Sequence, residues 1–427
     1  MIYNYLNYFT QDTIKKVNNW DKKLSPITAS ALKKTSFPEP QWWLGSVQLG
    51  KSPIGLFFTD NPLASAGTSI FPKEALMRTL GETLERYSST NSHLLDKPYL
   101  KLVDEQLEFI RCADFESTLP SFKAEGITSE IEHSKVTRLI DGLDEYLPYE
   151  HVHLGFLRTN KQLMHTSPIS TGCAFYYDSL TAIWKGICEV VERDAMMRLW
   201  YTKSQPIKIK MKDVLDYSLY SRIKKIRNAG LKVHVFEISS TVGIPVIYTI
   251  IQGEQYPYYC VGASADLNIT KAINKSIDEA ISIRVVANWS KSKGNKAYDY
   301  TNFYWVDHLE KHMELYANWK DTPAFDFLLN SNLNEVSLHE VEHTGDYLTQ
   351  PNTMDDLVDI ASIFKNKGFD IYYKDITVPE VKEYGHVMKV VIPQMIPLSQ
   401  AYACRWLSPF QAAYEAGQLN PYPHPFA

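Results

Sequence analysis

Two segments of the sequence carry the same pattern of charged residues, Glu-x-x-Glu-Arg, at positions 82–86 and 189–193. Because an α-helix turns by about 100° per residue, the glutamates and the arginine of each copy fall on one helix face, opposite a stripe of apolar residues. Carboxylate oxygens suit a hard divalent cation such as Mg2+ that also bridges to phosphates. The pattern therefore indicates a magnesium–nucleotide site.

A third segment that is expected to be helical, residues 270–289, contributes two further charged residues. Its apolar residues point almost all round, which predicts a buried helix. Glu279 and Arg284 project about 140° apart in such a helix and cannot pair with each other. Since a buried and unpaired charge costs several kcal/mol, we expect each to have a partner, a metal or a ligand.

The alternative to a nucleotide site is a set of structural ion pairs. In each copy of the motif the first glutamate and the arginine have the (i, i+4) spacing of surface ion pairs, which stabilise a helix by only about 0.2–0.5 kcal/mol each. Against this, Met196 and Trp200 continue the charged face of the second helix, so that face becomes apolar within two turns. Residue geometry alone leaves both interpretations open.

A different nucleotide motif is present at residues 45–52, which match the P-loop expression G-x-x-x-x-G-K-[ST] letter for letter. A functional P-loop needs a helix that starts at its Lys-Ser, so that backbone N–H groups cradle phosphate. Here Pro53 and the apolar run after it predict a strand, and Val47 and Leu49 alternate with polar residues like one arm of a hairpin. We interpret the segment as a β-hairpin in which Lys51 does not bind nucleotide.

The elements that position these residues can be predicted from hydrophobic periodicity. Helices are expected over residues 72–93, 178–200 and 270–289. Short runs rich in β-branched and aromatic residues predict strands, and these runs are residues 231–240, 244–253, 256–264 and 386–395. The mixture predicts an α/β (α+β) protein, with an N-terminal extension over residues 1–41 and a main domain over residues 42–427.

Composition excludes several classes of protein. The net charge is only −5 and the basic residues are dispersed, which argues against nucleic-acid binding. The start of the sequence lacks the pattern of a signal peptide, and no run of about 18 apolar residues occurs, so we expect neither export nor a membrane span. The five cysteines are widely separated, so we expect reduced thiols in a cytoplasmic protein.

Three segments together resemble the three signature helices of the YcaO family, in the family's order. They are ALMRTLGETLERYSS, AIWKGICEVVERDAMMRLW and GASADLNITKAINKSIDEAISIR, and the likeness extends from about residue 60 to the end of the sequence. The resemblance implies a YcaO-like fold, in which helices flank mixed β-sheets and a site for ATP and Mg2+ lies between them.

The resemblance also implies which residues bind the nucleotide and the metal. The metal and phosphate glutamates would be Glu82, Glu85, Glu189 and Glu192. Arg193 would contact phosphate, and Glu279 with Arg284 would form the third wall of the site. Ser282 stands where many members have glutamine, which is a departure from the family's pattern at that contact.

The segment at residues 421–427, PYPHPFA, is similar to the Pro-x-Pro-x-Pro tail of azoline-forming members of the family. Alternate prolines favour an extended, stiff conformation that can place a chain end in a pocket with little loss of entropy. The alternative is a frayed terminus. The resemblance implies a catalytic role for Pro423, Pro425 and the carboxylate on Ala427, and the imidazole of His424 is a further candidate for carrying protons.

The reaction implied by the resemblance forms azoline rings in a ribosomal precursor peptide. A Cys, Ser or Thr side chain attacks the preceding amide carbonyl, ATP phosphorylates the amide-derived oxygen, and loss of phosphate leaves a thiazoline or oxazoline. In that family a partner protein that binds the peptide's leader commonly accompanies the enzyme, often with a flavin-dependent azoline dehydrogenase. We expect a subunit of such a multi-protein synthetase for a bacteriocin-like peptide, with a homodimer as one arrangement within it.

Two other functions stay open on the sequence. YcaO proteins that form thioamides or macrocyclic amidines use the same ATP activation, although the Pro-rich segment argues against them. A non-catalytic scaffold would instead use the charged helices to dock a partner enzyme. Magnesium-dependent nucleotide binding by the purified chain separates an enzyme from a scaffold.

Overall fold

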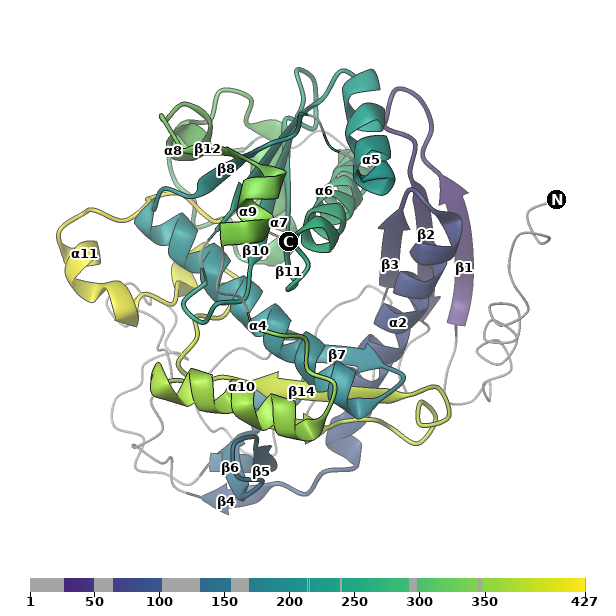
Figure 1. The fold of residues 1–427 in the computed structure, drawn as a ribbon, viewed down its shortest axis with the longest axis vertical. Coiled ribbons are helices and arrows are strands. Elements are labelled where there is room, and N and C mark those ends of the chain that lie inside the picture. Colours follow the sequence, from purple (N-terminus) through teal and green to yellow (C-terminus); the bar gives the residue numbers. More distant parts are fainter. Residues whose placement is uncertain are drawn as a thin grey trace.

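The computed structural model describes residues 27–49, 64–101, 131–154, 169–212, 214, 216–238, 240–291, 298–344 and 348–426. These residues form three β-sheets and the helices that pack on them (Figure 1). Helix α4 (Ser179–Thr202) runs through the middle of the molecule and contacts strands of two of the sheets. The predicted α/β class is confirmed.

The first sheet is antiparallel and has the order β1-β2-β3. Its strands are β1 (Ile27–Lys34), β2 (Trp43–Leu49) and β3 (Ala64–Ser69). Helix α2 (Pro72–Asn91) packs on β2 and β3. Strand β1 lies in the segment that we predicted to be an N-terminal extension, and it pairs with β2 along its length. Residues before 42 therefore contribute to the first sheet, and the boundary at residue 41 stays a prediction.

The second sheet has the order β11-β10-β9-β8-β12, and only β12 pairs in parallel, with β8. Its strands are β8 (Ile207–Lys210), β9 (Lys232–Glu237), β10 (Val246–Gln252), β11 (Tyr259–Ala265) and β12 (Glu335–Ser337). Helices α5 (Tyr217–Asn228) and α6 (Ile269–Lys291) share a hydrophobic cluster with one face, and α4 shares another with the opposite face. Three predicted strands are thereby confirmed as β9, β10 and β11.

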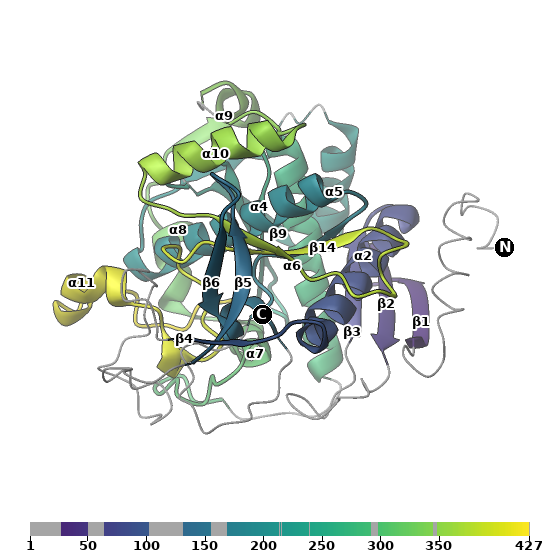
Figure 2. The same cartoon turned by 90° about the horizontal axis from the view of Figure 1, so that it is seen from below.

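The third sheet has the order β4-β5-β13-β14-β7, and β6 pairs with β5 (Figure 2). Its strands are β4 (Tyr99–Lys101), β5 (Ile131–Arg138), β6 (Asp144–Pro148), β7 (Cys173–Tyr176), β13 (Tyr372–Asp375) and β14 (His386–Val391). The strand predicted at residues 386–395 is confirmed as β14. The remaining helices are α3 (Tyr149–Val152), α7 (Leu309–Asn318), α8 (Asp326–Leu329), α9 (Leu338–Thr344), α10 (Met354–Asn366) and α11 (Gln411–Glu415).

The three predicted charged helices are confirmed as α2, α4 and α6, and local signals explain their boundaries. Pro72 occupies the first turn of α2, where its missing N–H is no loss. The Asp178 side chain caps α4 by accepting a hydrogen bond from the Thr181 N–H at 2.7 Å. Lys203 ends α4 in the left-handed conformation, with φ of 52°.

Two glycines let a strand lie directly against its helix. A Cβ on Gly67 of β3 would come within 2.6 Å of the Ala75 carbonyl oxygen of α2. A Cβ on Gly262 of β11 would come within 2.3 Å of the Ser276 carbonyl oxygen of α6. Only glycine permits this approach, which brings polar groups on each helix within hydrogen-bonding reach of the strand backbone.

Two predictions from composition can be compared with the described residues. No helix among them is both long enough and apolar enough to cross a membrane. Cys173, Cys188, Cys260 and Cys404 are free thiols, as predicted. Cys112 lies outside the described residues.

Glu237 at the end of β9 makes the stability of the fold depend on pH. Its side chain is buried, and the described part of the chain gives its carboxylate no hydrogen bond. Burial raises its pKa from 4.5 to about 7. Between about pH 4.5 and 7 the folded state thus retains a proton on Glu237 that the unfolded state loses. The contribution of Glu237 to the free energy of unfolding therefore falls as the pH rises through this range and is level above it.

We therefore expect Glu237→Gln to stabilise the protein at pH 8 by up to about 3 kcal/mol, and to have little effect near pH 4. Denaturant unfolding of both proteins across this pH range measures the difference. An equal effect of the substitution at pH 4 and pH 8 would contradict the role assigned to burial.

Candidate functional site

Three glutamates from three different helices are held by backbone N–H groups of strands. The hydrogen bonds run from Ala66 N to Glu82 at 3.1 Å, from Ala263 N to Glu279 at 2.8 Å and from Ala265 N to Glu192 at 3.1 Å. Ala66 and Ala263 adjoin the two glycines that permit close helix packing. Because β11 donates to both Glu279 and Glu192, it joins α6 to α4 at one place.

The remaining two predicted glutamates are Glu85 of α2 and Glu189 of α4, and the charge of Glu189 acts on the pKa of Glu85. Burial, followed by the negative charges of Glu189 and Glu82, raises the pKa of Glu85 well above its ordinary value. The N–H of Phe175 in β7 and the charge of Arg86 act in the opposite direction. Carboxylates far apart in the sequence therefore repel one another across the space between α2 and α4.

The cluster continues from α4 to α6 with alternating charge. Burial raises the pKa of Glu189, while Arg193 lowers it. Burial and then Glu192 raise the pKa of Glu279 to about 7, while Arg193 lowers it. Such mutual repulsion between buried carboxylates is relieved by a bound cation.

Arg193 lies among these carboxylates without a close partner. Its side chain is only 15% exposed, and its shortest ion-pair contacts, to Glu189 and Glu192, are both 3.9 Å. Within the described residues its Nε has no hydrogen-bond acceptor. A buried guanidinium with a free N–H is a strong donor for a phosphate oxygen. The position therefore fits the predicted phosphate contact.

Two lysines of the site were not predicted. Lys275 of α6 is exposed at the surface, and the charges of Glu192, Glu279 and Glu189 outweigh the effect of desolvation and raise its pKa. It lies four residues before Glu279, a spacing that could have revealed it in the sequence. The second is Lys389 of β14, whose positive charge lowers the pKa of Glu189. Its ammonium also donates to the carbonyls of Ile169 and Thr171, at 2.9 and 2.7 Å. No local pattern marks Lys389.

The donor set fits Mg2+ in its chemistry but is not a preformed cage. Among the described residues, no three His, Cys, Asp or Glu side chains are arranged so as to hold a metal ion by themselves. Mg2+ is commonly held by one or two carboxylates together with phosphate oxygens and water. The glutamates can therefore hold the ion together with a nucleotide.

Arg284 is not brought to the other predicted site residues. Its guanidinium donates to Glu39 at 3.0 Å and to the Pro257 carbonyl at 2.6 Å. Ala263, the residue whose N–H holds Glu279, lies six residues after Pro257 in the chain. Six residues of extended chain span about 20 Å. Arg284 thus has the partner that its burial requires. Its assignment to the nucleotide site stays a prediction.

The ion-pair interpretation is correct for one pair of the motif. Arg86 donates from Nε to Glu82 at 2.8 Å, and both side chains are partly exposed. In the second copy the corresponding contact, between Glu189 and Arg193, is much longer. Met196 and Trp200 are fully buried, as their place on that face predicted.

The Pro-rich segment is buried from Pro423 to Phe426, whereas Pro421 is exposed and Tyr422 half-buried, and Ala427 lies outside the described residues. The His424 ring uses both nitrogens: Nε2 donates to the Ser399 carbonyl at 2.6 Å, and Nδ1 accepts from the Phe426 N–H at 3.3 Å. Burial, with a smaller contribution from His312, holds the pKa of His424 well below its ordinary value. A neutral ring with both nitrogens engaged favours anchoring over proton transfer.

The P-loop-like match begins in a strand. Residues 45–49 belong to β2, which pairs with β1 and β3. The second arm of the predicted hairpin, together with Lys51, lies outside the described residues. Because the cluster of glutamates is built from other elements, we expect Lys51→Ala to change ATP affinity by less than about twofold. Calorimetric titration with ATP and Mg2+ measures this, and loss of binding by a folded variant would restore the P-loop interpretation.

Comparison with known protein families identifies the chain. A family profile described as YcaO cyclodehydratase, ATP- and Mg2+-binding, matches residues 66–396. The chain belongs to the YcaO family. The predicted family and its cofactors, ATP and Mg2+, are thereby confirmed, and the family is one of enzymes. None of the curated proteins compared with this YcaO chain matches it.

Solved structures of similar fold include three that are informative. A heterocyclase in complex with substrate and cofactor is 16% identical with a TM-score of 0.73, and the match covers 98% of this chain and 57% of that one. YcaO from Methanopyrus kandleri, bound with AMPPCP and Mg2+, is 14% identical with a TM-score of 0.61 and 92% coverage of both chains. A chain of the E. coli microcin synthetase McbBCD complex is 15% identical with a TM-score of 0.60, covering 87% and 91%. The YcaO-like fold is confirmed.

Proposed function

We propose that this YcaO chain is an ATP-dependent cyclodehydratase that converts Cys, Ser or Thr of a ribosomal precursor peptide to thiazoline or oxazoline. The observation that carries the proposal is the cluster of glutamates from α4 and α6 around Arg193, whose Nε has no acceptor among the described residues, with Glu85 of α2 beside Glu189. A scaffold would have no need for closely placed carboxylates that repel one another.

The proposed reaction removes one water from the peptide for each ring formed. The side-chain sulfur or oxygen bonds to the preceding carbonyl carbon and loses its proton, and the carbonyl oxygen accepts the γ-phosphoryl group of ATP. The carbon–oxygen bond then breaks as phosphate leaves, the amide nitrogen loses its proton and a C=N bond forms. The products are ADP, phosphate and a peptide that is lighter by one water for each ring.

The roles of the chain's residues follow from their chemistry. Glu82, Glu85, Glu189 and Glu192 would hold Mg2+, which neutralises phosphate charge when bound. Arg193 and Lys275 would contact phosphate oxygens, because both cations lie beside Glu189, Glu192 and Glu279, Arg193 largely buried and Lys275 exposed to an incoming ligand. The carboxylate on Ala427 would accept a proton from the reacting peptide, with Pro423 and Pro425 holding it in place.

Partners of two kinds are proposed for this chain. A leader-binding protein would deliver the precursor peptide, and a flavin-dependent dehydrogenase would oxidise azolines to azoles. The matched microcin synthetase is a complex named for three components, and one matched heterocyclase was solved with its substrate, which supports a peptide substrate and an assembly. A cytoplasmic location and a homodimer within the assembly are part of the same proposal.

Mass spectrometry of the precursor peptide tests the proposal. The peptide is incubated with this chain, its partner protein, ATP and Mg2+, and omission of ATP is the control. We expect loss of one water for each ring. An unchanged peptide mass in an assembly that binds ATP would overturn the proposal, and a gain of sulfur would instead identify a thioamide.

A further inference from the structure

Three consecutive carbonyl groups of the Pro-rich segment are held by buried side chains of two helices. The donors are Trp200 Nε1 to the Tyr422 carbonyl at 2.9 Å, the Tyr316 hydroxyl to the Pro423 carbonyl, and His312 Nδ1 to the His424 carbonyl at 2.6 Å. A slip of the segment by one residue would break these bonds, and an unpaired buried polar group costs about 1–3 kcal/mol. The contacts therefore specify one register.

The donors are rigidly placed. Trp200 and His312 have no exposed surface and Tyr316 is only 1% exposed. His312 and Tyr316 are one turn apart on α7, so both face the segment from the same side. Trp200 comes from α4 and reaches the segment separately.

A pair of stacked imidazoles adds to this contact. The rings of His312 and His424 are 3.9 Å apart between centroids, with an angle of 12° between their planes. Burial lowers the pKa of His312 to about 4, so the ring is neutral near pH 7. Because the His424 carbonyl can only accept, His312 Nδ1 carries the proton.

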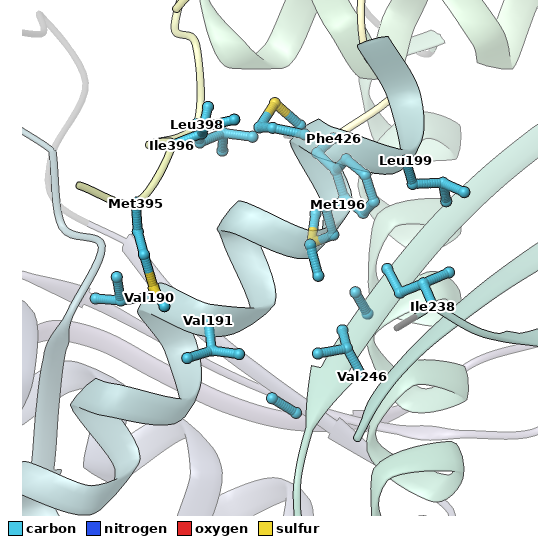
Figure 3. Close-up of a cluster of buried hydrophobic side chains, with 14 of the residues drawn as sticks. Val190, Val191, Met196, Leu199, Ile238, Val246, Met395, Ile396, Leu398 and Phe426 are labelled. Atoms are coloured by element: carbon cyan, nitrogen blue, oxygen red, sulfur yellow. The ribbon is translucent and has the colours of Figure 1, made fainter. Parts of the chain in front are cut away.

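The two ends of the described segment contact different elements. The Tyr422 carbonyl accepts from Trp200 of α4, whereas the Phe426 ring packs edge-on against Tyr248 of β10, 5.3 Å between centroids, in the buried cluster that also contains Met196 (Figure 3). The positive charge of Arg193 lowers the pKa of His424, which places the segment near that guanidinium. Arg193 and Trp200 are two turns apart, about 10 Å along one helix.

We propose that Trp200, Tyr316 and His312 are positioning residues that fix the register of residues 422–426 against the face of α4 that carries Glu192 and Arg193. These three residues form a main-chain clamp. Its contribution to ring formation rests on the proposed function, whereas its hold on the segment does not. The two parts are tested by separate measurements.

The first measurement is hydrogen–deuterium exchange of the peptide that contains residues 422–426, in the full chain without nucleotide. Tyr316→Phe and His312→Leu should each accelerate exchange about tenfold, the effect of about 1.4 kcal/mol. Tyr256→Phe is the matched control, because its hydroxyl also donates to a backbone carbonyl, that of Ala287 at 2.6 Å, outside the segment. His312→Asn retains a donor near the Nδ1 position and should slow exchange relative to His312→Leu.

The second measurement is ring formation by the same variants in the complete synthetase, together with their ATP affinity. We expect about tenfold slower ring formation in Tyr316→Phe and His312→Leu, partial recovery in His312→Asn and unchanged ATP affinity. Unchanged exchange would overturn the clamp whatever the activity of the chain. Faster exchange with full ring formation would overturn its positioning role. If the unmodified chain formed no rings, the proposed function would fall, and the exchange data alone would decide the clamp.

Discussion

Glu192→Gln is expected to lower ATP turnover by about 100-fold or more while leaving the fold intact. Glu192 is 4% exposed and lies between Arg193 and the Ala265 N–H. Glutamine has the same shape and its carbonyl oxygen can still accept the Ala265 hydrogen bond, so the folded state should survive. The substitution removes one negative charge from the carboxylates that would hold Mg2+.

Phosphate release from ATP measures the turnover, and thermal unfolding verifies the fold. Glu335→Gln is a suitable control, because it also removes a glutamate from an ion pair, with Lys208 at 2.6 Å on the exposed edge of β12. The control should retain full turnover. Undiminished turnover by Glu192→Gln would remove Glu192 from the metal site.

Deletion of residues 423–427 is expected to suppress ring formation by about 100-fold or more while ATP affinity changes by less than about threefold. The segment is held by the clamp, and its Phe426 is part of the buried cluster that contains Met196, but Glu82, Glu192 and Glu279 are held by strands β3 and β11. Loss of the segment would remove the proposed proton acceptor and leave the nucleotide site assembled. Ring formation is followed by the mass of the precursor peptide and ATP affinity by calorimetry.

Two further variants separate the possible causes. Residues added after Ala427 should suppress ring formation without removing the buried Phe426, whereas the same residues added before Met1 should have no effect. His424→Ala tests the imidazole separately. Since His424 is neutral and both its nitrogens are engaged, we expect this variant to lose ring formation only to the extent that exchange of the segment accelerates. Full ring formation after deletion would exclude any catalytic role for the segment.

The helices that carry the site could be predicted from the sequence because their signals are local. Pro72, the Asp178 cap and the apolar periodicity of α2, α4 and α6 all act within a few residues of where they occur. The repeated glutamates could be found for the same reason, since spacing alone places them on one face. The register between α2 and α4 was not predictable, because it depends on contacts between residues far apart in the sequence.

Arg284 illustrates where helix geometry was sufficient and where it was not. Its burial and its separation from Glu279 follow from a turn of about 100° per residue. Its partner, Glu39, precedes it by 245 positions in a loop before β2. A sequence pattern cannot identify such a partner, and the assignment of Arg284 to the nucleotide site, which rests on the resemblance, stays a prediction.

The sequence by itself determined the class of fold, the three charged helices, the family and the chemistry of the carboxylates, since each of these depends on residue type and short-range spacing. Only the tertiary structure decided which backbone N–H groups hold the glutamates, that Lys389 joins them from β14, and that Trp200, Tyr316 and His312 hold the main chain of residues 422–424. These contacts join segments up to 222 residues apart. Their geometry is set by the packing of whole helices on sheets, which no local pattern records.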